Sequence, residues 1–228
     1  MKLYRTPRFF RWLFPNKTWG FSLSENAVYL TFDDGPDPEI TPWVLDLLNS
    51  EGIKATFFCV GDNVRKYPEI YDRILTEGHA MGNHSMEHLK GIRVSTKEYM
   101  RSVNEAAHWI DSDLFRPPYG RISLSQTYRL KRKYRIIMWT WLSYDFDRSV
   151  PLETIVANAK DSIGNGDILV LHDNSKTADR LKLLLPKFVE IIRSKKLNFQ
   201  KIESEKLTIA NVNSFSCTTV PSSKAPRT

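Results

Sequence analysis

The sequence predicts an α/β protein in which helices pack around a parallel sheet or barrel. Short strand-like runs alternate with helical segments between residues 27 and 194, an order typical of parallel sheets. Acidic and histidine residues fall at or just past the ends of these strands, at Asp33, His84, Asp145 and His172. Because the loops at the carboxyl ends of such strands carry the chemistry, we expect these residues to form one site.

The composition fits a single large globular domain. The chain has 228 residues, of which 41% are hydrophobic and 26% are charged, and both values are ordinary for a soluble protein. No stretch approaches the roughly 18 consecutive apolar residues that a membrane-spanning helix requires. The two cysteines, Cys59 and Cys217, are too few for a disulfide framework.

Proline and capping residues divide the first half of the chain. Thr41 is expected to cap a helix that has Pro42 at its first position, and Ser95 with Glu98 forms a capping box at the start of another helix. Runs of β-branched and aromatic residues mark the strands. The expected strands are 27–32, 54–60 and 79–83, and the expected helices are 42–52, 63–77 and 95–108.

The second half continues the alternation. Pro151 opens one helix, and the chain turns between Gly164 and Gly166 into the last strand. The expected strands here are 135–141 and 167–172, and the expected helices are 123–132, 151–162 and 179–194. We therefore place one domain over residues 27–205, after a basic-aromatic segment (1–26) and before a polar tail (206–228) whose composition predicts disorder.

Five positive charges precede the first acidic residue, Glu25, and alternate with aromatic residues. We favour a segment that packs its rings on the domain over one that lies on an anionic membrane, although residues 1–17 keep peripheral membrane contact open. No secretory signal is recognised, so we expect a cytoplasmic or membrane-peripheral protein. The basic patches come without a nucleic-acid recognition motif, and no nucleic-acid partner is expected. The five residues are Lys2, Arg5, Arg8, Arg11 and Lys17.

Two histidines point to a metal site. His84 and His88 lie four residues apart, and one helical turn would place both imidazoles on the same side of an ion. The zinc-protease motif does not fit, because Ser85 occupies the position of its glutamate. Two histidines leave a zinc site short of a third protein ligand, which the neighbouring pair Asp33 and Asp34 can supply.

The adjacent aspartates call for an explanation, because like charges side by side repel each other. Successive side chains on a strand point to opposite sides, so the two carboxylates can serve different purposes. One can bind the metal while the other acts as base toward water that the metal acidifies. A turn cap before Gly35 and Pro36 would account for one aspartate but not for both.

Four motifs then occur in order: 31-TFDDGP-36, 84-HSMEH-88, 115-FRPPYG-120 and 169-LVLHD-173. Together they resemble the motifs of the NodB-type polysaccharide deacetylases, carbohydrate esterase family 4, over about residues 27–200. The resemblance implies a deformed, incomplete (β/α) barrel of the NodB-homology type. It also implies a hydrolase that removes N-acetyl groups from an amino-sugar glycan, peptidoglycan- or chitin-like, with zinc, or alternatively Co²⁺ or Ni²⁺.

The resemblance assigns a role to each matching residue. Asp33 matches the general base, braced by Arg116, and Tyr119 matches the residue whose backbone N–H stabilises the oxyanion. His172 matches the general acid, and Asp145 the carboxylate that orients it. The residues that match the metal ligands are Asp34, His84 and His88, and those that match the substrate pocket are Leu171, Phe146 and Pro118.

One motif departs from the family pattern. Where the family usually has D-x-x-D-W, this chain has 142-LSYDF-146, so Leu142 and Phe146 replace the first aspartate and the tryptophan. The pocket wall therefore differs, and Asp147 is an alternative to Asp145 as the orienting carboxylate. The retained pair of acid and carboxylate favours N-deacetylation over ester cleavage, because an amine leaves only when it is protonated.

Three other functions stay open from the sequence. The basic-aromatic N-terminus fits a deacylase of a lipid-linked sugar at the membrane surface. The same chemistry without amide specificity would make an O-acetyl esterase acting on xylan-like polysaccharide. A catalytically inactive glycan-binding domain is the non-enzyme alternative, and the filled catalytic positions argue against it.

Overall fold

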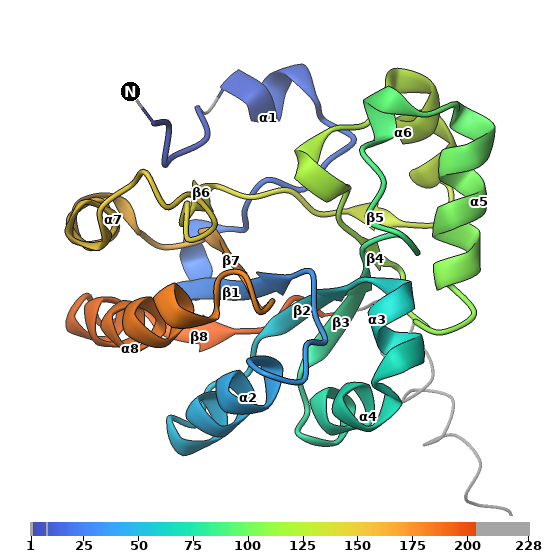
Figure 1. Cartoon of the computed structure of the whole chain (residues 1–228). Coiled ribbons are helices and arrows are strands. Elements are labelled where there is room, and N and C mark those ends of the chain that lie inside the picture. The colour runs from blue at the N-terminus through green and yellow to red at the C-terminus, as the bar shows by residue number, and fades with distance from the viewer. Residues whose placement is uncertain (1, 8, 204–228) are drawn as a thin grey trace, which may run out of the picture.

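The structure is a computed structural model that describes residues 2–7 and 9–203. Its eight strands form one sheet in the order β5-β4-β3-β2-β1-β7-β6, with β8 paired to β1. All pairings are parallel, and helices surround the curved sheet from outside (Figure 1). This is the deformed, incomplete (β/α) barrel that the sequence predicts. The tail predicted at 206–228 lies outside the described residues.

The central strand β1 (Ala27–Asp33) is buried along its whole length, as its continuous apolar run predicts. The other strands are β2 (Thr56–Cys59), β3 (Ala80–Asn83), β4 (Leu114–Phe115), β5 (Arg135–Ile136), β6 (Trp141–Leu142), β7 (Ile168–His172) and β8 (Asn198–Gln200). Sequence analysis missed β4 and β8, because two or three residues are too few to show a periodicity.

Sequence analysis did not predict the short helix at Phe9–Leu13. The helices from residue 41 onward agree with the predicted ones, with one exception. The single helix expected at 63–77 is two helices, because Pro68 disfavours helical backbone at Tyr67. The helices are α1 (Phe9–Leu13), α2 (Thr41–Ser50), α3 (Gly61–Lys66), α4 (Pro68–Thr76), α5 (Thr96–Ala106), α6 (Leu124–Leu130), α7 (Leu152–Ser162) and α8 (Ala178–Ser194). None of them, within the described part of the chain, is long and apolar enough to cross a membrane.

Thr41 does not cap α2 as predicted; Ile40 is the N-cap residue. The hydroxyl of Thr41 accepts a hydrogen bond from the backbone N–H of Asp37 (2.8 Å) and donates one to Oδ2 of Asp173 (2.7 Å). The hydroxyl of Thr41 therefore contacts Asp37 and Asp173 and does not cap the helix. The cap predicted at Ser95 is confirmed, since its side chain accepts from the N–H of Glu98.

The strand predicted at 135–141 is divided between the two edges of the sheet. Its first part, β5, pairs with β4, and its last part, β6, pairs with β7. Residues 137–140 cross from one edge to the other, with the N–H of Ile137 bonded to Phe115 and that of Thr140 bonded to Ile168. The barrel is incomplete because one short segment changes partners here.

The N-terminal segment lies along this crossing. The N–H of Thr6 bonds to the carbonyl of Thr140, and that of Thr18 bonds to the carbonyl of Ile136, both at 2.8 Å. Arg5 donates through both terminal nitrogens to the buried carboxylate of Asp167, at 2.7 and 2.9 Å. Phe10, Phe14 and Trp19 pack with the side chains of β4 and β5. These three rings of the segment thus pack on the domain.

Replacing Arg5 with alanine is expected to destabilise the fold by about 1–3 kcal/mol, because Asp167 would keep a buried charge without its partner. The measurement is the free energy of unfolding in urea. Arg65→Ala, which breaks the more exposed pair with Asp62, is the control and should change stability by less than about 0.5 kcal/mol. Equal effects of the two substitutions would contradict the importance assigned to Arg5.

Candidate active site

A cleft of about 730 Å³ opens at the carboxyl ends of the strands. It brings together residues that are far apart in the chain, from the ends of β1, β3, β4 and β7 and the loops that follow them. Acidic and imidazole groups line its floor, and aromatic and aliphatic side chains line its walls. The predicted site residues among its lining are Asp33, Asp34, His84, His88, Tyr119, Phe146 and His172.

The two aspartates diverge at the end of β1. Asp33 is the last residue of the strand, and Asp34 adopts a left-handed backbone with φ of 83°. Gly35 follows because a Cβ atom at this position would lie 2.2 Å from Oδ2 of Asp173. Asp173 is buried and accepts a hydrogen bond from the N–H of Gly35 at 3.2 Å. The turn therefore directs the two carboxylates to different partners.

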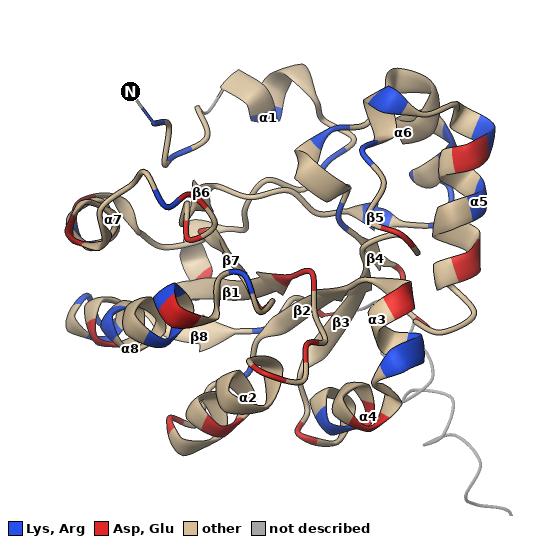
Figure 2. Ribbon diagram, in the orientation of Figure 1, with Lys and Arg blue, Asp and Glu red and all other residues tan. Residues whose placement is uncertain are grey.

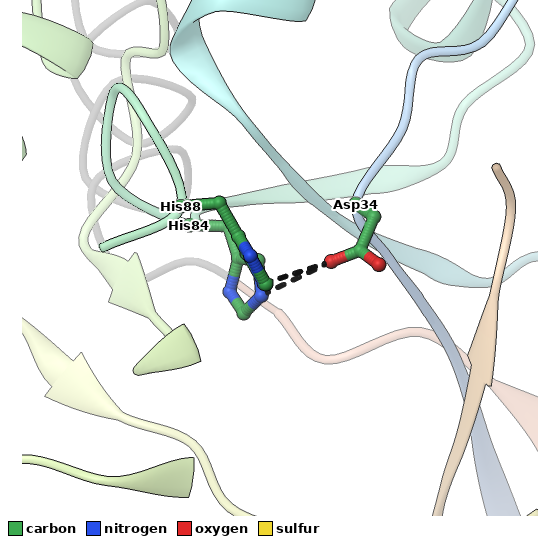
Figure 3. Close-up of side chains that lie close together, drawn as sticks. All are labelled: Asp34, His84 and His88. Atoms are coloured by element: carbon green, nitrogen blue, oxygen red, sulfur yellow. Dashed lines mark ion pairs between the residues drawn. The ribbon is translucent and has the colours of Figure 1, made fainter. Parts of the chain in front are cut away.

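Asp34, His84 and His88 meet in the cleft (Figure 3). Oδ1 of Asp34 lies 3.1 Å from Nε2 of His88 and 3.6 Å from Nε2 of His84. One ligand atom from each residue lies within 4.8 Å of the others. Oδ1 of Asp34 is buried and has no hydrogen-bond partner among the described residues. These three residues form a cluster whose ligand atoms face one another.

The two histidines do not lie on a helical turn, as the sequence analysis expected. They belong to a loop in which Ser85 and His88 have left-handed backbones, with φ of 64° and 55°. Oδ1 of Asn83 accepts from the N–H of Ser85, and the hydroxyl of Ser85 accepts from the N–H of Leu89. Side-chain bonds to the backbone thus replace the helical ladder and still bring both rings to one place.

His84 is held in one tautomer. Its Nδ1–H donates to the carbonyl oxygen of Arg116 at 2.7 Å, which leaves the lone pair of Nε2 facing Asp34. Burial lowers the pKa of His84 to about 4, so the ring is neutral at neutral pH. A neutral imidazole with a free lone pair is the form that binds a metal ion.

The residues fit a divalent cation. Two imidazole nitrogens and one carboxylate oxygen are the donor set of a catalytic zinc site, which leaves further positions open. The buried oxygen of Asp34 lacks a hydrogen bond, and a cation would satisfy it. Burial raises the pKa of Asp34, but the nearby histidines outweigh burial and hold this pKa well below its usual value. The ligand is therefore ionised across the ordinary pH range.

Arg116 braces Asp33 as predicted from the motif. Its Nη1 donates to Oδ1 of Asp33 at 2.6 Å and to the hydroxyl of Thr31 at 2.7 Å. The guanidinium is fully buried, and its remaining donors reach the carbonyls of Ile137 and Met138. The buried guanidinium therefore fixes the position of the Asp33 carboxylate.

His172 pairs with Asp145 rather than with Asp147. Nδ1 of His172 lies 2.7 Å from Oδ1 of Asp145, and the backbone N–H of His172 donates to Oδ2 at 2.8 Å. Asp147 is instead paired with Lys2 and Ser149 at the surface. Burial lowers the pKa of His172, but the buried carboxylates, Asp145 first, outweigh burial and raise it to about 10.

The predicted substrate-pocket residues need two corrections. Leu171 lies in the core between sheet and helices, because neighbouring residues of β7 point to opposite faces and His172 points to the cleft. Pro117 rather than Pro118 is in the cleft wall. Phe146 is in the wall as predicted, with its ring edge-on to His172 at 5.1 Å between centroids. Leu142, which stands where the family usually has an aspartate, also lines the cleft.

Tyr119 lies at the rim, with φ of 60° and its ring 4.6 Å from that of His88. Its side chain is exposed, and the residue lines the cleft.

Sequence analysis missed three contributors to the site. Asn174 donates to Oδ2 of Asp34 at 2.9 Å, and Asp173 positions the turn after β1. Asp173 and Asn174 are the two residues after His172. Their position just past the end of β7 is the one signal in the sequence that could have identified them. Trp139 lines the cleft from the crossing segment, and no sequence pattern separates it from Trp141, which is in the core.

Comparisons with known proteins agree with this geometry. The family model described as polysaccharide deacetylase matches residues 22–134. A peptidoglycan-N-acetylglucosamine deacetylase of Bacillus cereus is 36% identical over 180 residues, covering 74% of this chain and 84% of the relative. A chitooligosaccharide deacetylase of Azorhizobium caulinodans is 30% identical, covering 66% and 75%. The chain belongs to the polysaccharide deacetylase family.

A crystal structure of a family member has the same fold. The Bc1960 peptidoglycan N-acetylglucosamine deacetylase superposes with a TM-score of 0.79 at 29% identity, covering 86% of this chain and 95% of that one. The family resemblance and the fold predicted from the motifs are thereby confirmed, and so is membership of a class of deacetylating hydrolases.

Ionisation of His172 makes the stability of this deacetylase depend on pH. Its pKa is raised on folding, so its contribution is complete below the unfolded pKa of about 6.5 and is lost as pH rises toward about 10. We expect the unfolding free energy of the metal-free protein to fall over this window. Urea titrations with a chelator present measure it.

Asp145→Asn removes the carboxylate that contributes most to the raised pKa of His172. The unfolding free energy of this variant should therefore fall less steeply across the same pH window. Asp147→Asn is the control, because Asp147 contacts Lys2 and not His172. A slope unchanged in Asp145→Asn would show that this pair does not set the ionisation of His172.

Proposed function

We propose that this protein is a metal-dependent deacetylase that hydrolyses the N-acetyl groups of an amino-sugar glycan of peptidoglycan or chitin type. One observation carries the proposal: a single cleft holds the cluster Asp34–His84–His88 together with Asp33, which Arg116 holds in place, and the pair His172–Asp145. The names of the relatives, which deacetylate peptidoglycan and chitooligosaccharides, support the substrate class.

The cluster Asp34–His84–His88 would hold the cation. Bound there, a divalent metal such as zinc supplies Lewis acidity, which polarises the acetyl carbonyl and acidifies water. Asn174 fixes the carboxylate of Asp34, and the carbonyl of Arg116 fixes the ring of His84. These partners orient the ligands before substrate arrives.

Asp33 takes the proton of the attacking water. Arg116 holds this carboxylate at the cleft, where a general base must lie to reach the water. The backbone N–H of Tyr119 stabilises the negative charge that develops on the carbonyl oxygen. Tyr119 lines the cleft, and its backbone is left-handed with φ of 60°.

His172 gives a proton to the departing amine nitrogen. Its raised pKa, about 10, means that the ring carries the proton at neutral pH, and Asp145 accepts from Nδ1 so that Nε2 is the donating atom. An amide needs this proton because an amine anion is a very poor leaving group. This pair favours amide over ester substrates.

Asp33→Asn and His88→Ala should separate catalysis from metal binding. Asp33→Asn is expected to lower kcat by about 10²–10⁴-fold while zinc affinity changes little, since Asp33 lies outside the cluster. His88→Ala is expected to weaken zinc binding by at least about tenfold because one of three ligands is lost. Zinc affinity is measured by competition with a chelating dye, and thermal unfolding checks that both variants fold. Normal turnover by Asp33→Asn would overturn its role as base.

A substrate panel tests the proposed reaction. Zinc-loaded protein should release acetate from N-acetylglucosamine oligomers or peptidoglycan fragments, and a chelator should abolish this release. O-acetylated xylan is the comparison substrate. Acetate from the ester alone would make the protein an O-deacetylase, and binding of oligomers without acetate release would make it an inactive glycan-binding domain.

A further inference from the structure

Helix α1 has two apolar faces, and only one of them packs on the protein. Phe10 and Phe14, one turn apart, pack with Trp19 against the domain. Phe9, Trp12 and Leu13 follow the i, i+3, i+4 spacing, which places them on another side of the helix. The exposed fractions of these three side chains are 58%, 84% and 53%. We call Phe9, Trp12 and Leu13 the outer face of α1.

The surroundings of the outer face are basic. Arg11 is exposed on the same helix, and residues 2–24 contain no acidic side chain. Nζ of Lys131 reaches Oδ1 of Asn16 at 3.4 Å, so the exposed end of α6, with Arg132 and Lys133, adjoins the residues that follow α1. Figure 2 shows α1 without acidic residues and basic residues on the neighbouring α6.

We propose that the outer face of α1 docks this protein on the surface of an anionic lipid bilayer. Exposed Trp, Phe and Leu beside Lys and Arg are the combination that lies in the interfacial region of a membrane. Tryptophan in particular is enriched at that depth, because its large ring carries one polar N–H. Anionic headgroups would attract the surrounding lysines and arginines.

The charge distribution favours a membrane over a second copy of this chain. Two outer faces brought together would bring like charges together, which opposes association. An anionic surface instead attracts the basic side chains near the outer face, such as Arg11 and Lys131. The N-terminal segment that carries the outer face also contacts a loop of the cleft. Lys2 pairs with Asp147, and the hydroxyl of Tyr144 donates to the carbonyl of Leu3. The loop carrying Asp145 and Phe146 therefore contacts the N-terminal segment.

The test uses the full chain and vesicles of two compositions. The protein should sediment with phosphatidylglycerol-containing vesicles and not with pure phosphatidylcholine, and binding should weaken at about 0.5 M NaCl because the attraction is screened. Absence of binding to the anionic vesicles at low salt would overturn the proposal. This readout does not depend on catalytic activity, so it is independent of the deacetylase proposal.

Substitutions locate the contact. Phe9→Ser and Trp12→Ser are each expected to weaken vesicle binding by at least about tenfold, since each removes a large ring from the lipid. Leu183→Ser on α8 is the matched control, because Leu183 is 55% exposed and belongs to another helix. Unchanged thermal unfolding shows that the variants fold. Equal binding by Trp12→Ser and the parent chain would overturn the proposal.

Fluorescence reports the depth of contact. Lipids with brominated acyl chains should quench part of the tryptophan emission of the parent chain. Trp12→Phe should keep vesicle binding and lose most of this quenching. Light scattering without lipid decides the rival occupant: a dimer that Trp12→Ser converts to monomer would assign the outer face to a second copy and overturn the membrane proposal.

Discussion

The buried guanidinium of Arg116 is the interaction on which the site depends. Removing a cation from water is costly unless several acceptors surround it. Here the hydroxyl of Thr31, the carboxylate of Asp33 and the carbonyls of Ile137 and Met138 accept its hydrogen bonds. The ring centroid of Phe58 lies 4.0 Å from its Cζ atom. One side chain thus fixes β1, the segment after β5 and the proposed base together.

The same residue also orients the cluster Asp34–His84–His88, because its backbone carbonyl holds the ring of His84. The other parts of the cluster come from backbone that turns sharply: Asp34 and His88 have positive φ values, a conformation that costs energy for residues with side chains. Bonds from Asn63 to the carbonyl of Asp34, and from Asn174 to its carboxylate, hold this geometry. The pattern is that of a site organised in advance by surrounding hydrogen bonds.

The N-terminal segment does not enter the cleft, but it supports the elements around it, because the barrel is incomplete. Where the sheet changes partners between β5 and β6, backbone groups of Thr6 and Thr18 provide hydrogen bonds along the crossing. This places a basic-aromatic segment next to the cleft loop and leaves one face of α1 exposed. The segment that stabilises the sheet edge therefore also carries the surface proposed to bind a membrane.

The sequence by itself determined the alternation of strands and helices, the family, and the residues Asp33, Asp34, His84, Arg116 and His172, because these depend on local motifs and apolar runs. Only the tertiary structure decided that Asp145 and not Asp147 contacts His172, that Leu171 is in the core, and that 135–141 serves two edges. It also showed a loop, not a helical turn, between the two histidines. Contacts between distant segments determine these pairings and burials, and the spacing of residues along the chain does not reveal such contacts.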